Sequence, residues 1–155
     1  MLVNGGISSD SASEIVISER MPDLQVDITS SGSLVAPGGL LTQSIVVSNL
    51  SSTLMADELQ VVLDANTAFV SATGGGSHAN GVVTWPVSVG AGGSDSRQLT
   101  VSVNPDVNEG AFLSATAIFT DTLNVVSASD TEHRAVSAAN ALSLQVSSAA
   151  GTAVA

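Results

Sequence analysis

The chain has 155 residues, with no cysteine and no lysine, and its 14 acidic residues against three arginines give a formal net charge of −11 at pH 7. The absence of cysteine excludes disulfides, cysteine-based zinc sites and thiol catalysis. The scarcity of basic residues argues against nucleic acid and anionic membrane surfaces as partners, because both bind through clustered Lys and Arg.

The first residues are not expected to act as an export signal: either a signal has been removed or export does not use one. Met1–Gly6 has neither the basic region nor the long apolar run of a secretory signal. Elsewhere, no stretch approaches the roughly 20 apolar residues that a membrane-spanning helix needs. We therefore expect no membrane insertion.

Residues 1–21 form a polar, glycine-rich arm that contains one strand candidate, Glu14–Ser18. Its centre is Ile15, Val16 and Ile17, which are β-branched and favour strands. A strand-prone segment on a polar arm can add to an exposed sheet edge of another chain, and head-to-tail exchange of this kind builds filaments. The alternative is that the segment pairs with its own domain as an extra edge strand.

After the arm, apolar residues recur with period two, which is the pattern of half-buried β-strands. The predicted strands, in chain order, are Asp23–Thr29, Leu41–Asn49, Glu58–Asp64, Ala68–Val70, Gly81–Pro86, Leu99–Val103, Ala111–Thr120 and Leu142–Val146. Turn-rich breaks separate them at intervals of about ten residues, which is typical of an all-β sandwich. The pattern predicts a sandwich of about 7–9 strands over residues 22–147, with a small, bland tail at residues 148–155.

Within this domain the pattern makes three further predictions. Asn80-Gly81 predicts a type I′ hairpin turn, because both residues tolerate a positive φ. Thr131–Asn140 is the segment most compatible with one or two helical turns. The expected core consists of Leu41, Ile45, Leu63, Phe69, Trp85, Leu99, Val101, Leu113 and Phe119.

Four segments match a known family in order. They are Val35-Ala36-Pro37-Gly38-Gly39, Phe69–Gly75, Val83-Thr84-Trp85 with the following Gly90-Ala91-Gly92, and Leu99–Val103 with the following Leu113–Thr120. Over roughly residues 23–125 the chain thus resembles the conserved-repeat domain of bacterial and archaeal surface proteins that is termed domain of unknown function number eleven. The resemblance implies an immunoglobulin-like β-sandwich in secreted or wall-associated proteins, without catalytic residues. Gln43 stands where that family tends to place an aromatic residue.

Searches for catalytic patterns support the same interpretation. His78 and His133 have no second histidine at metal-binding spacing. The serines lack the G-x-S-x-G pattern of a nucleophile elbow, and Gly74–Gly76 is not followed by the lysine of a phosphate-binding loop. We therefore expect a protein that is not an enzyme and holds no cofactor.

Two surface motifs remain open at the level of sequence. Asn104–Gly110 carries oxygen-bearing side chains, and Asp106, Asn108 and Glu109 are candidate calcium ligands, since calcium takes six to eight oxygens. The alternative is a strand-connecting turn, in which Asn, Asp and Gly are common. Asn49-Leu50-Ser51 matches the acceptor pattern for N-glycosylation.

Together these patterns predict a non-enzymatic structural subunit of an extracellular or cell-surface assembly, a filament or appendage. It would self-associate through the arm into a homo-oligomer or polymer. One alternative is an adhesion or spacer module of a cell-surface protein, with a carbohydrate or protein partner. Another is a virion decoration protein, located on the virion surface.

Overall fold

The computed structural model describes residues 23–138, which form ten β-strands and no helix. These residues contain no helix that could cross a membrane. The strands are β1 (Leu24–Ser30), β2 (Leu34–Val35), β3 (Leu40–Asn49), β4 (Met55–Val62), β5 (Thr67–Ala72), β6 (Ser77–Ala79), β7 (Val82–Val89), β8 (Ser94–Val103), β9 (Phe112–Asp121) and β10 (Val126–Val136). The all-β prediction is confirmed. The sequence pattern did not predict the short strands β2 and β6 or the long strand β10, so the described residues contain more strands than expected.

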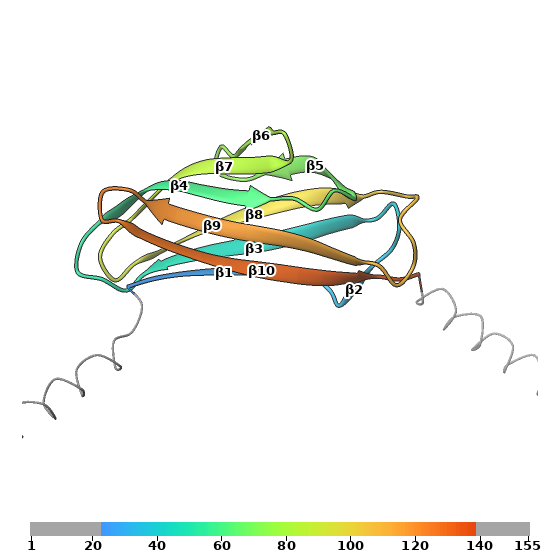
Figure 1. Cartoon of the computed structure of the whole chain (residues 1–155), viewed down its shortest axis with the longest axis horizontal. Helices are drawn as coiled ribbons and strands as arrows, with labels where there is room; N and C mark the ends of the chain where they lie inside the picture. The colour runs from blue at the N-terminus through green and yellow to red at the C-terminus, as the bar shows by residue number, and fades with distance from the viewer. Residues whose placement is uncertain (1–22, 139–155) are drawn as a thin grey trace, which may run out of the picture.

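The strands form two sheets that pack face to face (Figure 1). One sheet has the order β1-β3-β8-β5, and the other has the order β2-β10-β9-β4-β7-β6. The described chain begins with β1 at one end of the sandwich and finishes with β10 at the opposite end (Figure 1).

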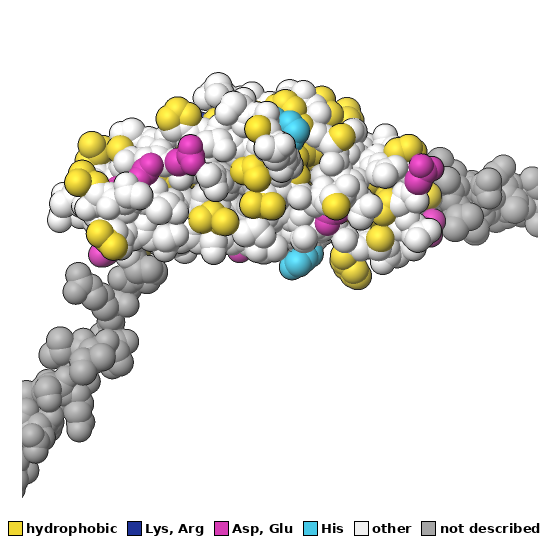
Figure 2. Space-filling model, turned by 45° about the horizontal axis from the view of Figure 1, so that its top comes forward, with side chains coloured by type: hydrophobic (Ala, Val, Ile, Leu, Met, Phe, Trp, Pro, Cys, Tyr) yellow, Lys and Arg dark blue, Asp and Glu magenta, His cyan; other side chains and the backbone are white. Residues whose placement is uncertain are grey.

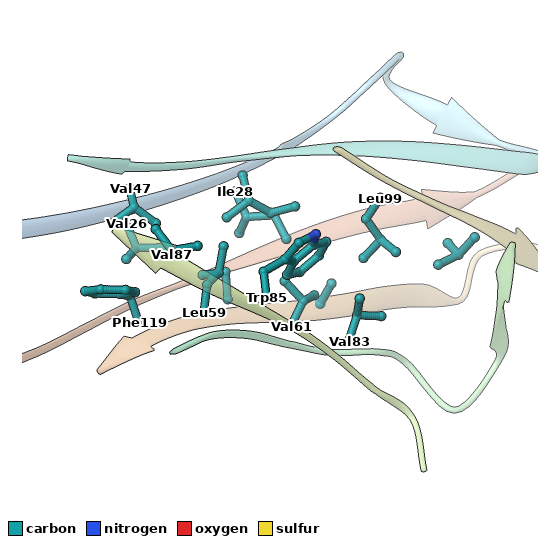
Figure 3. Packing of buried hydrophobic residues seen from close by; sticks show 14 of the residues in the cluster. Val26, Ile28, Val47, Leu59, Val61, Val83, Trp85, Val87, Leu99 and Phe119 are labelled. Carbon is teal, nitrogen blue, oxygen red and sulfur yellow. The ribbon is translucent and has the colours of Figure 1, made fainter. Parts of the chain in front are cut away.

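Alternation along the strands decides which side chains enter the core. In β9, Leu113, Ala115, Ala117 and Phe119 are buried, and the residues between them face outward. Trp85 and Phe119 are the largest fully buried side chains, and they lie between the sheets among aliphatic residues (Figure 3). Burial of one such side chain contributes about 1.5–3 kcal/mol, so the two-residue period is the main source of stability.

Most of the expected core is confirmed. Seven of the nine residues are buried, namely Leu41, Ile45, Trp85, Leu99, Val101, Leu113 and Phe119. Leu63 and Phe69 are corrections, because both are only partly buried and pack against the edge of the core. They lie at the side of the sandwich where the two sheets do not close on each other, as described below.

The hairpin prediction is confirmed and the helix prediction is wrong. Asn80 and Gly81 have φ values of 52° and 78° and join β6 to β7 as a two-residue turn. Thr131–Val136, in contrast, belongs to β10, which pairs with β9 from Val126 to Ala135. Pairing with a neighbouring strand outweighs a weak local preference, since β10 has no apolar helical stripe of its own.

Several predictions fall on other parts of the chain. The arm at residues 1–21 with its strand candidate Glu14–Ser18, the predicted strand Leu142–Val146 and the tail at residues 148–155 lie outside the described residues.

Candidate functional site at the edges of the two sheets

The two long sides of the sandwich differ in how the sheet edges meet. On one side β1 lies beside β10, and we call this the closed seam. On the other side β5 ends the first sheet and β6 ends the second, and we call this the open seam. Edge strands matter for function because their unpaired backbone groups can pair with another chain.

At the closed seam, a side chain of β10 satisfies the backbone of β1. Asp130 Oδ2 accepts a hydrogen bond from the N–H of Ile28 at 3.0 Å. Asp130 is half-buried and faces β1, although the two strands belong to different sheets. A charged acceptor in this position occupies a donor that an added strand would need.

Arg134 closes the same seam further along. Its Nη2 donates to the carbonyl oxygen of Ser30 at 3.2 Å, and its Nη1 donates to that of Ser33 at 3.2 Å. It also forms an ion pair with Glu132 at 3.0 Å, and both side chains are largely buried. Inward-pointing charges on an edge strand are a known protection against unwanted strand pairing.

At the open seam, β5 borders an apolar groove of about 450 Å³. Its walls are Leu63, Asp64, Ala65, Thr67, Ala68, Phe69, His78 and Gly81. The Asp64 carboxylate is already engaged, since it accepts hydrogen bonds from the N–H groups of Asn66 and Ser114, both at 2.8 Å. The groove therefore presents mainly hydrocarbon beside an exposed strand edge.

Two aromatic contacts hold the open seam together. The rings of Phe69 and His78 stack with their centroids 4.8 Å apart and their planes within 7°. Deeper in the seam, Trp85 Nε1 donates to the carbonyl oxygen of Thr73 at 2.7 Å. Gly76 lies directly against the Trp85 ring, where a Cβ atom would collide with the indole and lie 2.9 Å from Ala72 Cβ. These contacts anchor the loop between β5 and β6 to the core.

A β-bulge divides β5. Thr67, Ala68 and Phe69 pair regularly with β8, and the register then shifts between Phe69 and Ser71. The residue at the shift, Val70, is 48% exposed. A bulge twists an edge strand away from regular pairing, so the regular part of the open edge is Thr67–Phe69.

The calcium candidates lie together in the exposed loop between β8 and β9, where Asp106, Asn108 and Glu109 are all exposed. Backbone turns shape this loop, and Asn104 Oδ1 accepts the N–H of Asp106 at 2.9 Å. Within residues 23–138, no group of three or more His, Cys, Asp or Glu residues is arranged to hold a metal ion. Calcium binding at this loop stays a prediction.

Asn49 of the glycosylation pattern has a structural role. It is fully buried, and its Nδ2 donates to the carbonyl oxygens of Thr53 at 2.7 Å and Val89 at 2.9 Å. Its Oδ1 accepts from both the N–H and the hydroxyl of Ser51. The nitrogen that a glycan would modify is therefore enclosed and engaged, and the side chain ties the loop after β3 to the end of β7.

Two carboxylates stabilise the β9–β10 hairpin at one end of the closed seam. Asp121 is buried and accepts hydrogen bonds from the N–H groups of Asn124, Ala56 and Leu123, and from the Asn124 side chain. These bonds, the Asn124 N–H foremost, lower the pKa of Asp121 against the opposing effect of burial. The hydroxyl and then the N–H of Thr122 lower the pKa of Asp57 in the same way.

The two histidines lie on different strands. His78 lies on β6 and His133 on the outer face of β10, and both are exposed (cyan in Figure 2). On the face drawn in Figure 2, acidic side chains are visible and arginines are not. This agrees with the inward positions of Arg97 and Arg134, whose side chains are 20% and 16% exposed.

Comparisons with known proteins identify the fold. No protein-family model matches the sequence, and no curated protein matches it. The solved structure of a FixG-related protein from Vibrio parahaemolyticus is similar, with a TM-score of 0.53 and 13% identity over 75% of this chain and 98% of that chain. So is BcpA, the major pilin subunit of Bacillus cereus, with a TM-score of 0.53 and 13% identity over 73% of this chain and 40% of that chain. BslA, described as a bacterial hydrophobin, has a TM-score of 0.52 and 11% identity over 77% of this chain and 98% of that chain.

Identities this low show the fold alone. The immunoglobulin-like β-sandwich expected from the sequence is confirmed.

Sequence reasoning did not find either seam. The half-buried charges of β10, Asp130, Glu132 and Arg134, alternate with small polar residues, and this alternation was the available signal. The sequence indicates the open seam even less clearly, because Phe69 and His78 lie on two separate short strands and their contact is not visible in the sequence pattern.

Proposed function

We propose that this chain is a non-enzymatic structural subunit of an extracellular or cell-surface assembly. We propose further that it self-associates when the N-terminal arm adds a strand to the sandwich of another copy. The observation that supports this function best is the open seam, where a sheet edge borders an apolar groove. A backbone edge supplies hydrogen bonds and a groove accepts alternate side chains, which are the two requirements for strand addition.

The placement of the chain ends favours extended assemblies. Asp23 and the end of β10 lie at opposite ends of the sandwich (Figure 1). An arm that leaves from one end and binds a different surface makes a heterologous contact, and such contacts extend into filaments when the rotation does not close. The fold itself is compatible with this use, since the pilin subunit named above has a similar sandwich.

The opposite placement of the ends also favours a second function, a spacer or adhesion module within a longer surface protein. A module that joins its neighbours end to end needs its two termini far apart. In that case the sandwich would remain a monomer in solution, and the arm would act only as a linker.

Light scattering on the full chain separates the two functions. We expect high-mass, polydisperse species that reduce to single subunits when Ile15→Glu and Ile17→Glu are introduced together, because charge at both positions prevents an apolar strand from being buried. Ser9→Glu with Ser11→Glu is the matched control, with the same added charge and spacing, and should leave the high mass unchanged. A wild-type chain that is monomeric at all concentrations would contradict self-association and support the spacer.

A further inference from the structure

We infer that the acceptor site for the arm is the regular part of β5 at the open seam of a second copy, where Ile15–Ile17 pairs with Thr67–Phe69. This inference rests on the proposed function, since it assumes that the arm adds a strand. It goes further because it names the acceptor strand and its paired residues, and because it places the contact between copies and not within one copy.

The other sheet edges are less suitable. The outward N–H of Ile28 on β1 is occupied by Asp130, and the carbonyl of Ser30 is occupied by Arg134. β10 presents half-buried charges at this seam, so an apolar strand placed there would bury Asp130 and Glu132 without new partners. β2 has only two residues, and all three residues of β6 are exposed. β5 has six residues, and within the described residues no side chain hydrogen-bonds to the backbone of Thr67–Ala72; at its start, the Thr67 N–H donates to the Asp64 carbonyl oxygen at 3.0 Å.

The side chains of β5 match an alternating apolar strand. All three residues border the groove; Thr67 and Phe69 are half-buried, whereas Ala68 between them is exposed, as the alternation of a strand requires. In an extended strand beside β5, alternate side chains point to opposite faces. Ile15 and Ile17 would enter the groove beside Phe69 and Leu63, and Val16 would lie outside beside Ala68. This arrangement would bury two isoleucines and would also bury more of the Leu63 and Phe69 side chains, which are only partly buried in the single copy. Both changes remove apolar surface from water and favour binding.

Geometry places the acceptor beyond the reach of the same copy. The register pairs Leu24 with Asn49, Leu41 with Val101, and Val101 with Phe69. Phe69 therefore lies three strands away from Leu24 across the sheet, which is roughly 14 Å, and eight residues away along the strands, which is roughly 26 Å. The straight-line distance between the two residues is then about 30 Å. A strand added outside β5 lies about 5 Å further out. The seven residues from Ile17 to Leu24 span at most about 25 Å when fully extended, and Figure 1 shows β5 diagonally across from the start of β1.

Cysteine crosslinking tests the site directly, because the natural chain has no cysteine to interfere. We would mix Val16→Cys with Ala68→Cys in the full-length chain, oxidise the mixture and measure the disulfide-linked heterodimer by non-reducing electrophoresis. We expect at least about tenfold more heterodimer than with the matched control, Val16→Cys mixed with Gln25→Cys, since binding raises the local thiol concentration. Gln25 is likewise exposed and lies on β1 of the closed seam.

Each outcome supports or overturns the inference. A double variant, Val16→Cys with Ala68→Cys, should give a ladder of linked polymers. A linked monomer instead would show addition within one copy, and equal linking to Ala68→Cys and Gln25→Cys would show an unspecific collision. Both results would overturn the inference. If the wild-type chain still assembles and the arm variant does not, the proposed function survives that failure; if the wild type is monomeric, both proposals fail.

Discussion

The closed seam and the open seam belong to the same sandwich, yet they treat an exposed sheet edge in opposite ways. Where β1 meets β10, Asp130 and Arg134 use their charges to satisfy backbone groups of the neighbouring sheet. Where β5 faces β6, the contact is a stacked Phe69–His78 pair above a groove. The difference teaches that edge protection is local, since a fold can block one side with charged side chains and leave the other available.

The largest expected effect concerns the anchoring of the open seam. Gly76→Ala places a methyl group against the Trp85 ring and 2.9 Å from Ala72 Cβ. We expect the free energy of unfolding to fall by about 2–3 kcal/mol, because overpacking forces the ring or the loop to move. Urea denaturation monitored by the fluorescence of Trp85 measures this loss.

Gly90→Ala is the matched control for that change. A Cβ at Gly90 would meet no heavy atom within 4 Å, so its effect should remain within about 0.5 kcal/mol. Equal losses in the two variants would mean that the loop before β6 is not held against Trp85.

The next effect concerns the closed seam. Asp130→Ala removes the carboxylate that accepts the N–H of Ile28, and a hydrogen bond to a charged group at a half-buried site contributes about 1–2 kcal/mol. Thermal unfolding should show that loss. Asp27→Ala, which removes an exposed carboxylate on the same β1 strand, should change stability by no more than about 0.5 kcal/mol. Closure of this seam by packing alone would predict the same small effect for both variants.

The smallest effect concerns the hairpin that ends the closed seam, and it depends on pH. The pKa of Asp121 is lowered in the folded protein, so the unfolded chain takes up a proton first as the pH falls. The stabilisation is complete above the ordinary aspartate pKa of about 4 and is lost as the pH falls through the lower folded value. Melting temperatures between pH 7 and pH 3 should therefore decline at the acid end, and Asp121→Asn should make that decline shallower. An unchanged decline in the variant would exclude Asp121 as a contributor.

The sequence was sufficient to predict the all-β class, most of the long strands and most of the core, but not β10. Leu99, Val101 and Val103 alternate cleanly with polar residues, and all three are buried in β8. A period of two is a local property, so it is visible without knowledge of the fold. The same reasoning predicted the turn at Asn80-Gly81, because positive φ values depend on these two residues themselves.

The seams were not predictable in this way. Asp130 and Ile28 are 102 positions apart, and their contact depends on which strands become edges. The family resemblance marked Gln43 as unusual, and it is buried with 3% exposure while its Oε1 has no hydrogen-bond partner within the described residues. Its position in a strand followed from the pattern, whereas its surroundings depend on residues from both sheets.

The β9–β10 hairpin illustrates a further limit. Asn124 is the residue that commonly adopts a positive φ, but Val125 adopts it, with φ at 57°. A β-branched residue in this region is strained. The hydrogen bonds from Leu123 and Asn124 to Asp121 impose that geometry, and a propensity scale cannot detect them.

The parallel course of β1 and β10 has a mechanical consequence. Ile28 contacts Asp130 and Ser30 contacts Arg134, so both strands run in the same direction, and the described chain enters at one end and leaves at the other. Tension applied between Asp23 and Ala138 acts along these strands, whereas their antiparallel hydrogen bonds to β3 and β9 lie across them. The seven residue pairs of β1 with β3 are loaded together in shear, instead of being peeled apart one by one.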